Sequence, residues 1–486
     1  SSWITLTVHE GCYTNAAIWN RGYVPTNTSQ AVQINTSNLG DFRFKLTDWQ
    51  TKAAYHMLMV YPGSTLTLDG IGATFDVPAL TEDEGVYFTD PATFSIQTGA
   101  SVPKTKLLLL SYVMDPTTGK THVPTYREPQ YRLEDVYLTI TNTADNDVTM
   151  DFVQGTFDFD YGGDPYRIYQ FGTGMLETNN QGEWIRSETV RFHSGATLKF
   201  PYARFNGMSC SNAVNYTVAG KILVAADLNV DGLARVLFTD GAQVSAKTIG
   251  RSYSGNSLDD PVMTIDGAET RVQASSEFFV GFKGCGTLNM RDGELTIGTY
   301  FAFGNSAPDA PQNCTLNQTG GKIEANMVVA CRQANSAYLT STLNLDGGEL
   351  SASRMYGSNT KVQGKLGTGI LSANGGIYRS RGELLKEEFP FLGGFDRAEL
   401  GPKGLTIWTD FQNRIYQAFT NKVGQTGRLF LKGSGTIYLA ADTFQGRARF
   451  GREQFGVRFN GHEVRRKRHR YEWDLRFVRG FFCADA

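Results

Sequence analysis

The amino-acid sequence predicts an all-β protein built mainly as a parallel β-helix, also called a β-solenoid. Three observations lead to this fold class. Of the 486 residues, 41% are hydrophobic and 12% are aromatic, which is enough for a substantial core. Glycine contributes 53 residues, more than the usual share of roughly 7%, while long stretches with helical periodicity are nearly absent. The third observation is a short unit that recurs along the chain.

The recurring unit is clearest in the segment TLNLDGGELSA, residues 342–352, where two short alternating runs flank a turn. The unit recurs every 25 to 29 residues, a length that fits one turn of a solenoid. The strands of such a turn pair with the coils above and below at a spacing of about 4.8 Å. A meander of independent hairpins is the alternative, because Asp-Gly and Gly-Gly also form two-residue turns. Segments that share the apolar residue and the following glycine begin at eight positions, 25 to 29 residues apart: Leu237, Met263, Leu288, Leu316, Leu343, Leu371, Leu400 and Leu429.

Three columns recur in the aligned units, and two of them predict stacking between coils. Asp240, Asp266 and Asp346 each precede the corner glycine, where aspartate favours a turn, so we interpret them as turn formers rather than as catalytic carboxylates. A second column holds asparagines whose amides can form a hydrogen-bonded ladder: Asn289, Asn317 and Asn344. A third column holds glycines at a corner where we expect positive φ: Gly293, Gly321, Gly348 and Gly376.

The repeats divide the chain into three predicted parts. Residues 206–446 contain the parallel β-helix repeats, each of about 27 residues. Residues 1–205 are β-rich but follow the columns poorly, so they form either irregular β-helix coils with long insertions or a separate β-sandwich. Coil-like pieces at 59–75 and 190–200 favour the first arrangement. Residues 447–486 form a basic C-terminal tail that lacks the repeat.

The C-terminal tail is distinguished by its charge. It contains eleven Lys and Arg residues against five Asp and Glu, although the formal net charge of the whole chain is −2. We favour a solvated basic strand edge, or coding sequence that is out of frame or truncated, over a polyanion-binding role. We therefore do not expect nucleic acid as a partner. The candidate polyanion-binding residues are Arg465, Arg466, Lys467, Arg468 and Arg470.

The segment FDFDYGGD, residues 157–164, is a candidate site for a glycan or a cation. Because successive strand residues face opposite sides, Asp158 and Asp160 would face solvent while Phe157 and Phe159 face the core. A solvated strand face is the alternative, and we favour it. The full candidate set is Asp158, Asp160, Asp164, Tyr161 and Tyr166.

The segment DLNVDG, residues 227–232, resembles the front of a calcium-binding loop. Asp227, Asn229 and Asp231 stand at the first, third and fifth loop positions. The twelfth position, where such a loop needs an acidic bidentate ligand, is Phe238. A strand that enters a turn is the favoured alternative, so calcium is a minor possibility and no other cofactor is expected.

The distribution of histidine limits the chemistry of the repeats. No histidine occurs between residues 194 and 461, so the repeats cannot use imidazole as a base or a metal ligand. Carboxylates are available instead. Glycoside hydrolysis needs two carboxyl groups about 5–10 Å apart, and neighbouring coils can supply that separation.

The six cysteines include no CxxC pair, which argues against zinc ribbons and thioredoxin-like chemistry. Cys285 and Cys314 occupy near-equivalent positions on successive coils. Stacked in this way, they either form a disulfide in an exported protein or stay as buried free thiols, and the sequence leaves both open.

The segment KGSGTIYLAADTFQG, residues 432–446, resembles the autotransporter-associated β-strand repeat, which typically reads K-x-G-x-G-T-L-x-L followed by N-T-Y-x-G. Asp442 stands where Asn is usual, and Phe444 replaces Tyr. The resemblance implies a right-handed β-helix in the passenger of a secreted or surface-displayed bacterial protein. The matching positions are Lys432, Gly433, Gly435, Thr436, Ile437, Leu439, Thr443, Phe444 and Gly446.

These observations favour a non-enzymatic extracellular β-solenoid that acts as a stalk, an adhesin or a glycan-binding passenger. The alternative is a polysaccharide-active β-helical enzyme, a glycoside hydrolase or a polysaccharide lyase, that uses clustered carboxylates. A polysaccharide or cell-surface glycan is the expected partner in both cases. No apolar run of about 18 residues is present to span a membrane. The chain opens on SSWITLTV, so we expect a signal segment to be absent from this sequence.

Overall fold

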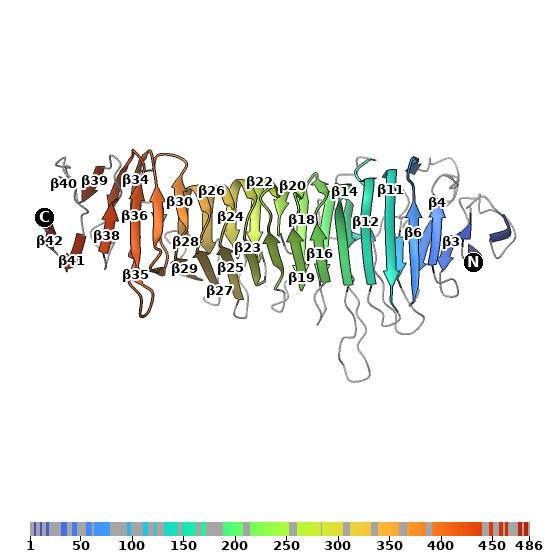
Figure 1. The fold of residues 1–486 in the computed structure, drawn as a ribbon, viewed down its shortest axis with the longest axis horizontal. Helices are drawn as coiled ribbons and strands as arrows, with labels where there is room; N and C mark the ends of the chain where they lie inside the picture. The colour runs from blue at the N-terminus through green and yellow to red at the C-terminus, as the bar shows by residue number, and fades with distance from the viewer. Residues whose placement is uncertain are drawn as a thin grey trace, which may run out of the picture. The chain divides into compact units, whose positions relative to one another are not determined.

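The computed structural model is almost entirely β-structure (Figure 1), which confirms the predicted fold class. Among the described residues the one helical element is a 3-10 turn, η1 (Ala16–Ile18). No helix in these parts of the chain has the length and apolar character needed to cross a membrane. The structure describes residues 4–5, 10–11, 16–18, 31–35, 41–45, 55–60, 63–77, 95–98, 110–114, 121–122, 131–143, 148–161, 167–171, 188–207, 214–251, 260–282, 284–304, 312–331, 339–358, 367–384, 391–439, 447–450, 456–459, 462–464, 475–478 and 481–484.

The chain divides into unit 1, Ser1–Lys247, and unit 2, Thr248–Ala486. Unit 1 combines parallel stacking with antiparallel pairs: β12 pairs parallel with β14 and β14 with β16, whereas β11 runs antiparallel to both β6 and β12, and β9 runs antiparallel to both β10 and β13. The strands are β1 (Ile4–Thr5), β2 (Glu10–Gly11), β3 (Ala31–Asn35), β4 (Asp41–Lys45), β5 (Tyr55–Val60), β6 (Ser64–Asp69), β7 (Thr74–Val77), β8 (Ser95–Thr98), β9 (Leu110–Met114), β10 (Thr121–His122), β11 (Tyr131–Asn142), β12 (Val148–Asp158), β13 (Arg167–Phe171), β14 (Glu188–Phe200), β15 (Tyr202–Gly207), β16 (Val214–Val218), β17 (Lys221–Val224), β18 (Asp227–Gly232), β19 (Ala234–Phe238) and β20 (Gln243–Ile249), which crosses the division in sequence.

Unit 2 is a regular parallel β-solenoid up to its last strands. β38 and β39 still pair parallel with the preceding coil, and antiparallel pairs follow them. Its strands are β21 (Val262–Ile265), β22 (Arg271–Val280), β23 (Gly286–Met290), β24 (Glu294–Phe303), β25 (Gln312–Gln318), β26 (Lys322–Cys331), β27 (Leu339–Leu345), β28 (Glu349–Ser358), β29 (Gly367–Ala373), β30 (Ile377–Ser380), β31 (Leu392–Gly393), β32 (Arg397–Leu400), β33 (Leu405–Trp408), β34 (Gln412–Tyr416), β35 (Thr420–Asn421), β36 (Arg428–Lys432), β37 (Thr436–Leu439), β38 (Arg447–Phe450), β39 (Gly456–Phe459), β40 (His462–Val464), β41 (Leu475–Val478) and β42 (Phe481–Ala484).

From Met263 onward, the repeat seen in the sequence is the coil of unit 2. β23, β25 and β27 lie side by side in Figure 1, and each register pair joins equivalent residues of successive coils, Thr287 with Thr315 and Thr315 with Thr342. The residue that directly follows each of these threonines points inward and is fully buried: Leu288, Leu316 and Leu343. Burial of one such side chain contributes about 1.5–3 kcal/mol, so the stacked leucines stabilise every coil against its neighbours. The alternative of independent hairpins is therefore wrong for this unit.

Each long strand of unit 2 has two differently buried halves. The first half of β22, β24 and β26 alternates between buried and partly exposed side chains. The second half is buried on both faces, as Phe278, Phe279 and Val280 show with exposed fractions of 0%, 2% and 0%. A coil therefore presents two faces with outward side chains, the first on β23, β25 and β27, and the second on the first halves of β24, β26 and β28.

The predicted glycine corner is correct at three coils and wrong at the fourth. Gly293, Gly321 and Gly348 have φ of 79°, 62° and 68°. At the next coil the positive φ, 134°, belongs to Gly375 rather than to Gly376. The Gly375 amide donates to the Gly404 carbonyl at 2.6 Å. In this Asn-Gly-Gly turn the residue with positive φ is thus the first glycine, one position before the predicted one.

Unit 1 is packed largely with aromatic side chains. The rings of Phe152 and Phe192 stack at 5.1 Å between centroids, and those of Phe205 and Tyr216 stack at 4.7 Å. The Tyr216 hydroxyl donates to the Phe171 carbonyl at 3.0 Å, which satisfies a buried polar group. This core fixes the ends of β12 and β14, where the first candidate site lies.

Candidate functional site

The end of β12 places two aspartates opposite two core phenylalanines, as the alternation predicts. Phe157 and Phe159 are 0% and 3% exposed, while Asp158 and Asp160 are only half-buried. The Asp160 amide donates to Asp158 Oδ1 at 3.2 Å, which closes a local turn directly after the strand. The turn brings both carboxyl groups to the surface of unit 1.

The two carboxyl groups have different environments. Asp158 Oδ2 lies 2.8 Å from Nζ of Lys199, its register partner on β14. Burial, followed by the nearby negative charge of Asp158, raises the pKa of Asp160, and Lys199 offsets part of this effect. One carboxyl is therefore ion-paired, whereas its neighbour keeps its proton to a higher pH than an ordinary aspartate.

An exposed aromatic ring adjoins these carboxyl groups. Tyr161 is 45% exposed. The guanidinium carbon of Arg132, on β11, lies 4.4 Å from the centre of the Tyr161 ring, and its Nη2 donates to the tyrosine hydroxyl at 3.1 Å. The Arg132 cation over one face of the Tyr161 ring holds the ring in place. Ring and guanidinium together present a surface that is partly apolar and partly polar.

We call the five residues Arg132, Asp158, Asp160, Tyr161 and Lys199 the aspartate–tyrosine cluster. It offers an aromatic surface together with charged donors and acceptors, which is the combination that orients a polyhydroxylated ligand. The two remaining residues of the predicted set, Asp164 and Tyr166, lie outside the described residues.

The predicted calcium loop is a strand. Asp227, Asn229 and Asp231 lie on β18, which pairs parallel with β15, and their exposed fractions are 7%, 1% and 0%. A strand separates successive residues by about 3.3 Å and spreads these side chains along a line, whereas a calcium loop wraps around its ion. Asp231 is also ion-paired with Arg204. No group of three or more His, Cys, Asp or Glu suited to a metal ion occurs in the described part of the chain.

The two cysteines are free thiols, one of the two alternatives that the sequence left open, and their near-equivalent positions differ by one residue of register. Cys314 pairs with Gly286, so Cys285 lies one position out of the column. Since neighbouring strand residues point to opposite faces, Cys314 is buried and Cys285 is partly exposed, and both are free thiols. Burial raises the pKa of the Cys314 thiol well above its ordinary value, so this thiol stays protonated.

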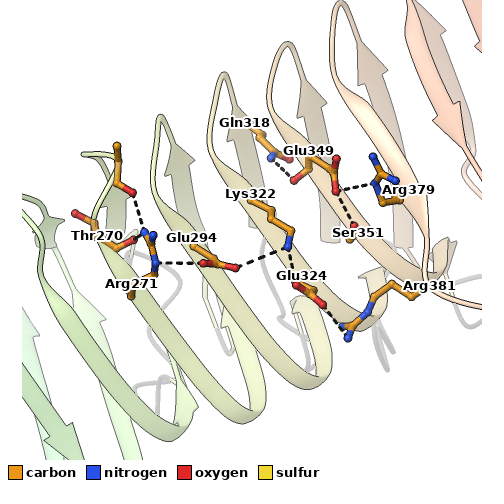
Figure 2. Close-up of polar contacts among 11 residues, drawn as sticks. Thr270, Arg271, Glu294, Gln318, Lys322, Glu324, Glu349, Ser351, Arg379 and Arg381 are labelled. Carbon is orange, nitrogen blue, oxygen red and sulfur yellow. Dashed lines mark hydrogen bonds and ion pairs between the residues drawn. The ribbon is translucent and has the colours of Figure 1, made fainter.

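The second face of unit 2 carries an arrangement that the sequence analysis missed. Arg271, Glu294, Lys322 and Glu349 are register partners on β22, β24, β26 and β28, so the sign of the charge alternates from coil to coil. Figure 2 shows Glu294 between Arg271 and Lys322, and Glu349 directed toward Arg379. We call this set, together with Glu324, Arg379 and Arg381, the charged ladder.

Every carboxylate of the charged ladder has a cationic partner. Glu294 lies 3.2 Å from Arg271 and 3.8 Å from Lys322, and Glu349 lies 2.9 Å from Arg379 (Figure 2). Further along the face, Glu324 contacts Lys322 at 3.0 Å and Arg381 at 2.9 Å.

The pairing also sets the protonation of the charged ladder. The hydrogen bond from Lys322, followed by the charge of Arg381, lowers the pKa of Glu324. The hydrogen bond to Glu324 raises the pKa of Lys322. Both groups are thereby held in their charged forms, which suits a structural role better than proton transfer.

A sequence signal for the charged ladder existed. Glu294, Lys322 and Glu349 each directly follow a glycine of the predicted corner column, and their charges alternate. The guanidinium carbon of Arg379 also lies 4.4 Å from the Trp408 ring centre, which extends the ladder to β33.

The predicted asparagine column lies on the first face of unit 2. Nδ2 of Asn317 donates to Oδ1 of Asn289 at 2.9 Å, and Nδ2 of Asn344 donates to Oδ1 of Asn317 at 2.9 Å. Asn289 in turn donates to the Thr264 hydroxyl at 3.4 Å. The candidate polyanion-binding residues of the tail, 465–470, lie outside the described residues.

No family model matches the chain, and neither a curated protein nor a solved structure is significantly similar to it. The autotransporter-associated repeat thus stays a prediction from sequence.

Proposed function

We propose that this protein is an extracellular β-solenoid that binds a glycan through the aspartate–tyrosine cluster. The observation that carries the proposal is the exposed ring of Tyr161 beside two carboxyl groups, with Arg132 against the ring. Sugar rings offer C–H groups to an aromatic face and hydroxyl groups to carboxylates and cations, so each member of the cluster has a role in such a complex. The export expected from the repeat resemblance supports the same proposal.

A glycan array probed with the full chain tests this proposal. The Tyr161→Ala variant should bind each positive glycan at least about tenfold more weakly, equivalent to about 1.4 kcal/mol. Phe411→Ala is the matched control, because Phe411 is an aromatic residue with a similar exposed fraction, 42% against 45%, that belongs to unit 2. Equal binding by wild type and Tyr161→Ala, or equal losses in both variants, would refute the role of the cluster.

A carbohydrate-active enzyme is the second candidate, and the unequal environments of the two aspartates favour it. Glycosidases need one protonated and one ionised carboxyl group, and a carboxyl group whose pKa is raised is a candidate for the protonated member. Asp160 has the raised pKa expected of a general acid, and the ion-paired Asp158 lies two residues away on the same side of the chain.

Product analysis on array-positive glycans separates the two candidates. An enzyme should release shorter sugars, and Asp160→Asn should abolish the release while binding persists. Binding without any product at every pH tested would refute the enzyme and support the binding proposal.

A further inference from the structure

The first face of unit 2 is a regular array of uncharged polar side chains. Parallel register places Thr287, Thr315 and Thr342 in one row across β23, β25 and β27. Asn289, Asn317 and Asn344 form the second row, two residues further along each strand. All six side chains are partly exposed, whereas the leucines between them are buried. We call these six residues the Thr–Asn face.

The geometry of the Thr–Asn face is periodic in two directions. Neighbouring strands are about 4.8 Å apart, and residues i and i+2 of a strand are about 6.6 Å apart. A ligand that uses several coils at once must therefore offer matching groups at a similar repeat. An extended polymer with one chemical unit repeated along its length meets this requirement, and a small molecule does not.

The amide row is oriented and still has hydrogen-bonding capacity. Asn317 uses one N–H toward Asn289 and one carbonyl lone pair toward Asn344. A carboxamide has two N–H groups and two lone pairs, so one donor and one acceptor per amide are left after the ladder is formed. Because the ladder fixes the side-chain torsions, binding would cost little conformational entropy at these positions.

The charge of the partner follows from a comparison of the two faces. The Thr–Asn face has no ionisable residue in its two rows, while the charged ladder lies on the next face of the same coils. A polyanion or a polycation would gain more from the second face than from the first. A neutral chain rich in hydroxyl groups matches donors and acceptors that carry no charge.

We propose that the Thr–Asn face binds an extended, uncharged polysaccharide that runs along the stacked coils of unit 2, with successive sugar units over successive coils. The class of ligand rests on the proposed function, but the residues are independent of the aspartate–tyrosine cluster. Here the affinity comes from repetition, because each coil adds a similar small contribution.

Depletion from solution by insoluble polysaccharides tests this inference with the full chain. The probes are cellulose, chitin and a linear β-1,3-glucan as neutral polymers, and polygalacturonate and alginate gels as acidic ones. We expect retention on at least one neutral polymer that persists at about 1 M NaCl, where the Debye length is about 3 Å. Retention only on the acidic gels, lost at this salt concentration, would overturn the inference.

Substitutions of the threonine row identify the surface. Thr315→Val keeps the shape and the strand preference of the side chain while it removes the hydroxyl. It should weaken binding about three- to tenfold, as for one ordinary hydrogen bond, and the triple variant T287V/T315V/T342V should weaken it further. Thr296→Val is the matched control, since Thr296 lies on the second face in register with Glu324. Equal losses in Thr315→Val and Thr296→Val would refute the assignment.

Three further outcomes are decisive. If Tyr161→Ala abolishes retention while the triple valine variant retains wild-type binding, this inference fails and the proposed function stands. If the triple variant alone loses retention, the Thr–Asn face binds the polymer and the cluster does not. A dimer in wild-type chromatography that the triple variant lacks would show a second copy of the chain on this face, and the inference would be wrong.

Discussion

Substitution of the corner glycine Gly348 by alanine should destabilise unit 2 strongly. Gly348 has φ of 68°, and a Cβ atom there would lie 2.3 Å from the Gly320 carbonyl oxygen and 2.5 Å from that of Gly321. The left-handed backbone alone costs an alanine about 1–2 kcal/mol. The clashing oxygens belong to the backbone of the preceding coil, so they cannot turn away as a side chain does, and the total should exceed about 2 kcal/mol.

Urea unfolding of the full chain, followed by circular dichroism, measures this loss. We expect a lower midpoint with an unchanged slope for Gly348→Ala. Gly382→Ala is the matched control, because no heavy atom lies within 4 Å of the Cβ position there, and its effect should stay within about 0.5 kcal/mol. Equal midpoints for the two variants would refute the argument from the corner geometry.

Three other changes should have separable effects. Asn317→Ala removes two amide hydrogen bonds and should lower the free energy of unfolding by about 1–3 kcal/mol, whereas the same change at Thr315 should cost less in the same urea titration. The pKa of Glu324 is lowered in the folded protein, so this carboxylate stabilises the fold above its ordinary pKa of 4.5. The stabilisation disappears as the pH falls through the lower pKa of the folded state. Glu324→Gln should therefore remove this acid-dependent part from a profile of melting temperature against pH. The pKa of Asp160 is raised in the folded protein, so this residue favours the folded state below its ordinary pKa of 3.8 and loses this advantage as the pH rises. Asp160→Asn should therefore gain stability relative to wild type between acidic and neutral pH. A stability difference between variant and wild type that does not change with pH would contradict the assignment.

The sequence predicts the coil of unit 2 well because the coil is repetitive. Any residue that stacks on its equivalent, such as Asn317 on Asn289, appears as a column at the same spacing. The outward placement of Asp158 followed from simple alternation, since Phe157 on the same strand had to enter the core. The periodicity of the sequence therefore predicts the fold and the face of the sheet on which each side chain lies.

Sequence reasoning failed where a single residue of register decides the outcome. The positive φ expected at Gly376 belongs to Gly375, and the one-residue offset between Cys285 and Cys314 decides that only Cys314 is buried. A shift of one residue turns a strand side chain from core to solvent, or moves a strained φ to the next glycine, and approximate alignment cannot resolve it. The charged ladder was missed for a different reason, because partners such as Arg271 and Glu294 differ in chemistry and do not resemble a conserved column.

The amide chain from Asn289 to Asn344 implies a rule for how this molecule can change in length. The inner amide, Asn317, meets an identical group on either side. A duplicated coil inserted beside Asn317 would therefore meet the same neighbouring groups that Asn317 has now. Such a protein can grow or shrink by whole windings without a redesign of its interior, while a gain of half a winding would leave every amide opposite the wrong partner.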